Sequence, residues 1–420
     1  STYSDAEEVK KMNEPLQGNF EGIGVQFQMI EDTLLVVQPV SNGPSEKIGI
    51  LAGDRIIAVN DSAIAGVKMS TEEIMKRLRG PKGSKVNLKI VRRGVQDPLV
   101  FTVKRDKIPI LSLDASYMIQ PKTGYIRINR FGATTAEEFK KAMKELQKQG
   151  MKDMILDLQG NGGGYLNAAI DLANEFLGQK ELIVYTEGRT AKRSDFYAKG
   201  NGEFRNGRLI VLVDEYTASA SEIVSGAVQD WDRGIIVGRR SFGKGLVQRP
   251  IDLPDGSMIR LTIARYYTPA GRCIQKPYDS STDYNKDLIE RFNHGELMNA
   301  DSIHFPDSLK VQTKKLGRTV YGGGGIMPDY FVPIDTTLYT DYHRNLVAKG
   351  AVIKFTMKFI EGHRKELANK YKKFESFNEK FIIDDDMLAT LREMGEKEGV
   401  KFNEEQYQKS LPLIKTQLKA

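Results

Sequence analysis

Hydrophobic positions follow two different periods along this 420-residue chain. From residue 21 to residue 106, short segments of alternating apolar and polar residues are separated by glycine and asparagine turns, a pattern typical of β-strands. One segment here, TEEIMKRLRG, has helical spacing instead, with Thr71 as its expected cap and Gly80 as its expected end. The pattern predicts a small β-rich module over residues 21–106.

Further along the chain, apolar strands alternate with amphipathic helices, as in TGYIRINRF, AEEFKKAMKELQKQG and KDMILDL. This alternation predicts a multi-domain α/β (α+β) protein whose core, over 107–334, has a mixed sheet with part of its strands parallel. A polar stretch, 278–320, is expected to be an insertion in that core. Residues 1–20 predict a short helix. The Lys/Glu-rich pattern of residues 335–420 predicts helices that either pack on the core or mediate assembly. A homo-oligomer is therefore one possible state of the chain.

Composition excludes several classes of protein. The 62 Lys and Arg residues exceed the 55 Asp and Glu residues by only seven, a modest net charge for this length. The two kinds of charge are interleaved, which is typical of solvated helix faces, so no nucleic-acid binding is predicted. A single cysteine and four scattered histidines offer neither a disulfide nor the spacing of metal ligands. No run approaches the about 18 consecutive apolar residues of a transmembrane segment. Because the chain starts at Ser1, a removed export signal or a lipid anchor would leave no trace.

The segment TASASEIVSG, 217–226, lies where an apolar strand, RLIVLVDEY, turns into a stretch of helical spacing. Two interpretations fit Ser219 here. With Glu222 it matches the Ser-x-x-Glu capping box, in which the serine hydroxyl accepts a hydrogen bond from a backbone N–H. Alternatively, the tight turn exposes the hydroxyl as a nucleophile, beside helix-start N–H groups that stabilise an oxyanion.

A nucleophilic Ser219 needs a base, and no histidine lies within seventy residues of it. Lys244 lies 25 residues downstream, directly after the apolar strand GIIVG that follows the helix. Because a strand–helix–strand unit returns the chain to the same sheet edge, Ser219 and Lys244 can meet there. A serine–lysine pair is a known nucleophile and base, provided that burial lowers the pKa of the lysine enough to leave it neutral near pH 7.

Two glycine-rich segments suggest nucleotide binding, but their details argue against it. GRRSFGKG, 238–245, lacks the Ser or Thr that would hold magnesium after the lysine, and a strand-like segment follows where a helix should begin. GNGGGY, 160–165, has Tyr165 where a dinucleotide loop has its third glycine or alanine. The second segment fits better as a turn whose backbone N–H groups face an anion.

Together these segments resemble the carboxy-terminal processing, or tail-specific, proteases, a family of serine peptidases (S41) that use a Ser/Lys dyad. The motifs that carry the resemblance are LDLQGNGGGYL (156–166), TASASEIVSGAVQDWDRGIIVG (217–238), RRSFGKGLVQ (239–248), RYYTPAGRCIQ (265–275) and YGGGGIMPDYFVP (321–333). The resemblance covers residues 15–333. It departs from the family at Gln159, where members often have arginine before the glycine turn.

The resemblance implies roles for five residues. Ser219, which opens SASE, is the nucleophile rather than Ser221, and Lys244 is the general base. Gln248 matches a glutamine that orients the lysine in some members. The oxyanion hole would consist of the N–H groups of Ala220 and of Gly163 in the glycine turn.

The β-rich module is similar to a PDZ domain. In NFEGIGVQF, 19–27, the residues Gly22, Ile23, Gly24 and Val25 match the carboxylate-binding loop, whose glycines let consecutive N–H groups point at a terminal carboxylate. SEKIGILAGDRIIAVN, 45–60, resembles the segment that leads into the central strands of that domain. A bound peptide would pair with the strand after the loop, and the helix TEEIMKRL would close an apolar groove over it.

The resemblance therefore implies a serine endopeptidase that cleaves proteins or peptides near a free, apolar C-terminus, with no metal or organic cofactor. It also implies a location in the bacterial cell envelope, most simply the periplasm. Two alternatives stay open at this stage. The chain could be a non-catalytic PDZ scaffold that binds peptides, or a latent protease whose PDZ domain blocks the cleft until a partner binds.

Overall fold

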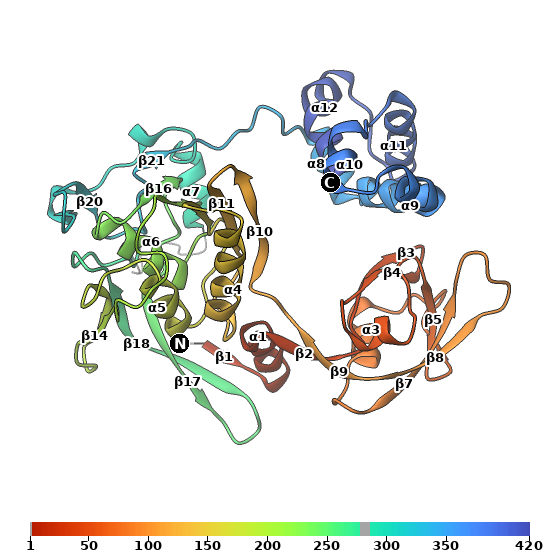
Figure 1. The fold of residues 1–420 in the computed structure, drawn as a ribbon, viewed down its shortest axis with the longest axis horizontal. Coiled ribbons are helices and arrows are strands. Elements are labelled where there is room, and N and C mark those ends of the chain that lie inside the picture. Colours follow the sequence, from red (N-terminus) through yellow and green to blue (C-terminus); the bar gives the residue numbers. More distant parts are fainter. Residues whose placement is uncertain (1, 278–285) are drawn as a thin grey trace. The chain divides into compact units, whose positions relative to one another are not determined.

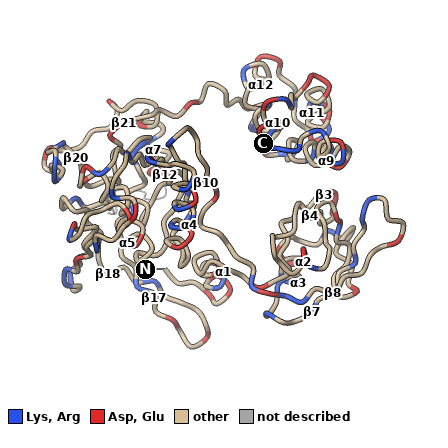
Figure 2. The backbone as a smooth tube through the Cα atoms, viewed as in Figure 1, with Lys and Arg blue, Asp and Glu red and all other residues tan. Residues whose placement is uncertain are grey.

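The computed structural model describes residues 2–277 and 286–420, so the first part of the predicted insertion, 278–285, lies outside the described residues. The chain forms two compact units (Figure 1). One unit consists of residues 1–20 and 107–333, and the other of residues 21–106 and 334–420. Basic and acidic residues alternate over both units, as the interleaved sequence predicts (Figure 2).

The first unit is built on a six-stranded sheet in the order β10-β11-β12-β15-β16-β21. These strands are β10 (Leu113–Gln120), β11 (Thr123–Ile128), β12 (Asp153–Asp157), β15 (Leu209–Val213), β16 (Ile235–Gly238) and β21 (Tyr330–Phe331). β10 and β11 are antiparallel, and the pairs from β11 onward are parallel. The mixed sheet confirms the predicted fold class of this unit.

Helices connect the parallel strands and bury their apolar faces against the sheet. They are α4 (Thr135–Lys148), α5 (Leu166–Asn174) and α6 (Ala220–Asp230). Every residue of α6 is buried. Because α6 contacts β13 as well as β16, it is covered on more than one side, which explains its apolar and small residues. β15, α6 and β16 form the predicted strand–helix–strand unit.

A second sheet of the same unit contains β1, β18, β13, β14 and β17. Their bounds are β1 (Thr2–Ser4), β13 (Leu182–Glu187), β14 (Ser194–Tyr197), β17 (Leu246–Asp252) and β18 (Met258–Tyr267). The predicted N-terminal helix is α1 (Ala6–Gln17), which ends at Gly18 in the left-handed conformation. The described part of the insertion contains α7 (Asp287–Asn293), two short 3-10 turns, β19 (Lys310–Gln312) and β20 (Thr319–Tyr321).

The β-rich module has the sheet order β3-β4-β5-β7-β8, with β6 paired to β5. Its elements are β3 (Val25–Ile30), β4 (Thr33–Pro39), α2 (Pro44–Lys47), β5 (Arg55–Val59), β6 (Ser62–Ala63), α3 (Thr71–Leu78), β7 (Lys85–Val91) and β8 (Leu99–Lys104). The expected cap of α3 was wrong by one residue. Ser70 precedes the helix in an extended conformation, and its side chain accepts from the Glu73 N–H, so Thr71 is the first helical residue.

Short strands β2 (Asn19–Gly22) and β9 (Asp106–Pro109) pair where the chain enters and leaves the β-rich module. The C-terminal residues form the predicted helices, namely α8 (Asp341–Ala348), α9 (Ala351–Lys370), α10 (Phe374–Lys380), α11 (Asp385–Lys397) and α12 (Glu404–Lys419). These helices bury their own apolar core, in which Leu346 and Ile414 are fully buried.

Candidate active site

Ser219 adopts a strained backbone conformation at the junction of a loop and a helix. The loop follows β15, and Ser219 is the residue immediately before α6. Its φ of 58° and ψ of −114° lie outside the extended region that a capping residue usually adopts. A positive φ in a residue with a side chain costs on the order of 1–3 kcal/mol, and such strain clusters at functional sites. The conformation is therefore one that plain helix capping does not require.

The predicted glycine turn lies directly against Ser219. A Cβ atom on Gly163 would lie 2.8 Å from the Ser219 Cβ and 2.8 Å from the Ala218 carbonyl oxygen, so a side chain at 163 is sterically excluded. The Asn161 carbonyl joins the two segments, accepting from the Ala218 N–H at 2.9 Å and from the Ser221 hydroxyl at 3.0 Å. The turn and the serine loop therefore form one hydrogen-bonded structure.

The backbone N–H groups of the glycine turn and of the start of α6 are of two kinds. Within the described part of the chain, the N–H groups of Ala220, Gly162 and Gly164 have no hydrogen-bond partner. The N–H of Gly163, in contrast, donates to Asn161 Oδ1 at 2.9 Å. Ala220 therefore has a free donor at the start of α6, as the sequence predicts, whereas the expected Gly163 donor is already engaged.

Glu222 joins the serine segment to the lysine segment. Its Oε2 accepts from the Ser219 N–H at 2.7 Å and from the Lys244 N–H at 2.9 Å. Its Oε1 accepts from the Gly243 N–H at 2.7 Å and from the Ser241 hydroxyl at 2.5 Å. The Glu222 carboxylate thus joins the main chains of Ser219 and Lys244, the two residues that the sequence predicts to meet.

The Glu222 carboxyl is completely buried, and burial raises its pKa while its four hydrogen bonds oppose that change. Sequence reasoning identified Glu222 only as the capping-box partner of Ser219. The predicted capping box is present, and the glutamate accepts from the Ser219 N–H at 2.7 Å. Nothing in the local spacing indicates the contacts with Gly243 and Lys244, which come from a segment about twenty residues away.

Lys244 occupies an environment that favours its neutral form. Burial is the main cause that lowers its pKa, and the positive charge of Arg260 on β18 lowers it further. The negative charge of Glu222 acts in the opposite direction. Among the described residues, the Lys244 ammonium forms no ion pair with a carboxylate side chain. These are the conditions that a lysine general base requires.

Gln248 lies on β17, next to an irregularity in the pairing of β17 with β18. Within the described residues, no hydrogen bond joins its side chain to Lys244. The role of Gln248 in orienting Lys244 therefore stays a prediction.

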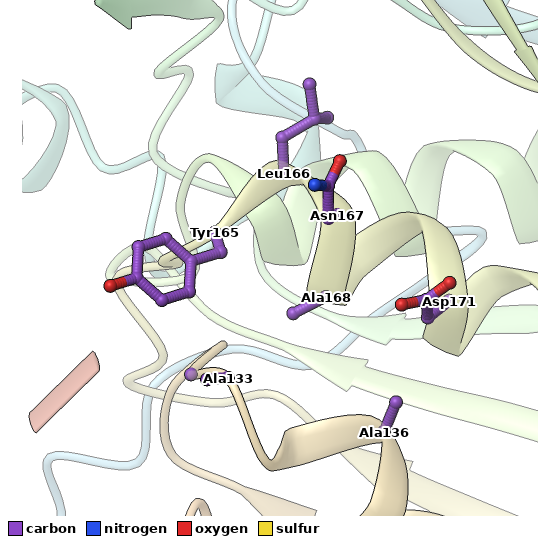
Figure 3. Close-up of a pocket in the computed structure, with 8 residues that line it drawn as sticks. Ala133, Ala136, Tyr165, Leu166, Asn167, Ala168 and Asp171 are labelled. Atoms are coloured by element: carbon purple, nitrogen blue, oxygen red, sulfur yellow. The ribbon is translucent and has the colours of Figure 1, made fainter. Parts of the chain in front are cut away.

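A cavity of about 460 Å³ lies directly after the glycine turn. Figure 3 shows the Tyr165 ring on one side of it and Asp171 further along α5, with Ala133 and Ala136 of the α4 segment facing Ala168. Four of its lining residues are small, namely Gly132, Ala133, Ala136 and Ala168, where the α4 segment and α5 contact each other. The cavity is large enough for an amino-acid side chain, and its lining includes Tyr165, the residue that directly follows the glycine turn.

The predicted carboxylate-binding loop lies between β2 and β3, in the other unit. Gly24 has a φ of 73°, and in the described chain the N–H groups of Ile23 and Gly24 have no partner. Ser45 fixes the loop, because its hydroxyl and its N–H both donate to the Ile23 carbonyl, at 2.6 Å and 3.1 Å. β3 is the edge strand of its sheet, so one side of it is free to pair with a peptide.

The described residues contain neither a cluster of metal ligands nor a helix that could span a membrane. No group of three or more His, Cys, Asp or Glu side chains in that part of the chain is arranged to hold a metal ion. No helix in the same residues combines the length and the apolar character needed to cross a membrane.

Three family matches cover most of the chain. Residues 122–282 match peptidase family S41, and residues 22–107 match the PDZ domain. Residues 342–420 match a family of unknown function.

Curated proteins of similar sequence are bacterial proteases. The chain is 31% identical over 400 residues to a probable CtpA-like serine protease of Staphylococcus aureus, a match that covers 93% of this chain and 76% of that protein. It is 39% identical over 282 residues to the carboxy-terminal-processing protease of Bartonella bacilliformis and 37% identical over 276 residues to the carboxy-terminal processing protease CtpA of Bacillus subtilis. These two matches cover 66% of this chain but only 63% and 58% of the relatives, less than two thirds of their length.

Proposed function

Because this chain belongs to the carboxy-terminal processing proteases of peptidase family S41, we propose that it is a serine endopeptidase in which Ser219 is the nucleophile and Lys244 the general base. One observation carries the proposal. A single buried carboxylate oxygen of Glu222 accepts from the backbone N–H groups of both residues, at 2.7 Å and 2.9 Å. The strain at Ser219 and the lowered pKa of Lys244 support the same assignment.

In this mechanism, Ser219 Oγ attacks a backbone carbonyl of the substrate while Lys244 Nζ takes its proton. The lysine then returns the proton to the leaving amine, and water hydrolyses the acyl-enzyme. A general base contributes on the order of 10²–10⁴-fold to the rate. Gln248 would orient Lys244 once substrate binds.

The oxyanion of the tetrahedral intermediate would accept from the Ala220 N–H and from a donor of the glycine turn. Gly163 can supply that second donor only if its N–H exchanges Asn161 Oδ1 for the oxyanion. Each such donor is worth about 3 kcal/mol of transition-state stabilisation.

The PDZ domain would select the substrate by its C-terminus. The free N–H groups of Ile23 and Gly24 suit a terminal carboxylate, and the unpaired side of β3 suits an extended peptide. The preference for an apolar C-terminal residue is the one that the resemblance to PDZ domains implies. The substrate class is therefore proteins or peptides with free, apolar C-termini.

Amidation of the substrate C-terminus tests this selection. We expect an unfolded test protein with an apolar C-terminus to be cleaved with a higher kcat/KM when that end is free than when it is amidated, because amidation removes the charge that the loop binds. A short peptide with the same free end should compete, and its amidated form should not. Equal rates for the two substrates would contradict selection by the PDZ domain, and stimulation by the free peptide would instead indicate a latent protease.

Replacing Arg260 tests the assignment of Lys244. Arg260→Gln removes a positive charge that lowers the pKa of Lys244, so that pKa should rise. Since only neutral Lys244 can accept a proton, the rising limb of kcat/KM against pH should move to higher pH. Arg249→Gln, on the exposed part of the same hairpin, is the matched control and should leave the limb in place. A limb that stays unchanged or moves to lower pH in Arg260→Gln would contradict Lys244 as the base.

We also propose that this chain is located in the bacterial cell envelope, a location that its similarity to bacterial carboxy-terminal processing proteases supports. Fractionation of cells followed by detection of the chain in each fraction tests it. Recovery in the cytoplasmic fraction alone would contradict the proposed location.

A further inference from the structure

Arg291 is a buried arginine of the insertion that contacts the loop carrying Lys244. We call residues 239–245 the lysine loop. Arg291 lies on α7, and only 3% of its surface is exposed. Its Nη1 donates to the Ser241 carbonyl at 3.1 Å and its Nη2 to the Arg240 carbonyl at 2.6 Å. A planar guanidinium can hold two neighbouring carbonyls at once, which an ammonium cannot do with the same geometry.

The insertion also supplies the charges that compensate this buried cation. Glu296 lies 3.3 Å from Arg291 Nε, and Asp287 lies 4.0 Å from its Nη1. Glu296 also pairs with Arg240 of the lysine loop. Burial, together with the nearby charge of Arg240, lowers the pKa of Arg291 to about 10, so the group is still cationic at neutral pH.

A second contact between the insertion and the lysine loop runs through Lys276. The Lys276 N–H donates to the Gly243 carbonyl at 3.0 Å, and its ammonium lies 3.9 Å from the centre of the Phe242 ring. Asp287 of α7 accepts from that ammonium at 2.8 Å. Gln275, the preceding residue, accepts from the Gly245 N–H at 2.9 Å through its side-chain oxygen.

These contacts divide the lysine loop between two partners. Glu222, from the serine segment, binds N–H groups of Gly243 and Lys244, whereas Arg291 and Lys276 bind carbonyls of Arg240, Ser241 and Gly243. The serine side alone therefore does not fix the loop, because its carbonyls are held by Arg291 of the insertion and by Lys276, which lies just before the insertion. Any change in the loop's main chain would move Lys244 relative to Ser219.

We infer that Arg291 is a positioning residue for Lys244, and that the described part of the insertion at α7 is needed to hold the general base in place. This inference rests on the proposed function. It gives a catalytic purpose to a segment whose sequence contains no catalytic motif.

Two substitutions of Arg291 test the inference. Arg291→Lys keeps the charge but loses the two-pronged geometry, and Arg291→Met keeps much of the volume but loses both hydrogen bonds. We expect kcat on an unfolded test protein to fall at least tenfold in each, with KM changed less than threefold, because substrate binding is not affected. The pH at which kcat/KM reaches half its maximum should also shift.

Arg233→Met is the matched control. Arg233 is a half-buried arginine, and it donates to the carbonyls of Phe176, Phe204 and Gly207, outside the lysine loop. The Arg233→Met variant should lose about as much thermal stability as the Arg291 variants, while its folded fraction keeps the native kcat and pH profile. If the Arg291 variants behave like Arg233→Met, their effect is structural only and the inference is overturned.

The pKa of Lys244 can also be measured directly, without following substrate cleavage. Competitive acylation of amines across a range of pH, followed by peptide mass analysis, reports the pKa of Lys244 in the whole chain. We expect that pKa to differ between the native chain and Arg291→Lys, and to be unchanged in Arg233→Met. An identical Lys244 profile in all three proteins overturns the inference. Absence of Ser219-dependent turnover in the native chain would instead overturn the proposed function, so the two failures are distinguishable.

Discussion

Lys244→Met is expected to lower kcat on an unfolded protein substrate by about 10²–10⁴-fold, the contribution of a general base. The methionine fills a similar volume but cannot accept a proton from Ser219. Lys244 lies where burial and the Arg260 charge favour its neutral form, so the loss should come from proton transfer rather than from lost binding. Initial rates at several substrate concentrations separate kcat from KM and test this expectation.

Lys244→Arg is the informative companion to this variant. Arginine keeps the positive charge and much of the length, but its pKa lies too high for it to act as a base near neutral pH. We therefore expect a loss of the same order as in Lys244→Met. An arginine variant that keeps native activity would show that Lys244 acts through its charge, and the dyad would be wrong.

Glu222→Ala is expected to reduce both stability and activity. The substitution removes four hydrogen bonds from a fully buried carboxyl and leaves the N–H groups of Ser219, Gly243 and Lys244 without that acceptor. Removing one partner of a buried charged network costs about 3–5 kcal/mol. Denaturant unfolding measures the loss of stability. Turnover measured without denaturant, at a temperature well below the thermal unfolding transition, measures activity.

Glu222→Gln provides the matched comparison for this prediction. The amide keeps the shape and one acceptor oxygen, but its NH₂ group faces donors on the other side, so stability and kcat should fall by less than in Glu222→Ala. A native free energy of unfolding and native kcat in both variants would contradict the role of Glu222 in joining the two segments.

The parts of the site that local sequence determines could be predicted. The apolar strand, the small-residue helix and the next strand fix Ser219 and Lys244 at one edge of a parallel sheet, because right-handed strand–helix–strand units place consecutive strands side by side. The mixed α/β fold, the PDZ module and the family resemblance are confirmed by the structure and by the matches to known proteins.

The parts of the site that depend on contacts between distant segments could not be predicted from the sequence. Glu222 looked like a local cap, and only the fold shows that its second oxygen reaches Gly243. The Gly163 N–H was expected to be free, but Asn161, two residues before it, folds back to accept from it. Arg291 gave no signal, since a lone arginine in a polar stretch is usually solvated and here it is buried against carbonyls of the lysine loop.

The role of Ser219 as nucleophile can be decided by comparing the rates at which the native chain, Ser219→Ala and Ser221→Ala cleave an unfolded protein with a free, apolar C-terminus. Ser221 is the matched control, since it is a fully buried serine two residues away whose hydroxyl donates to the Asn161 carbonyl. We predict that Ser219→Ala loses cleavage while Ser221→Ala retains it in its folded fraction. Cleavage by Ser219→Ala at the native rate would contradict the account and leave Ser219 as a helix cap alone.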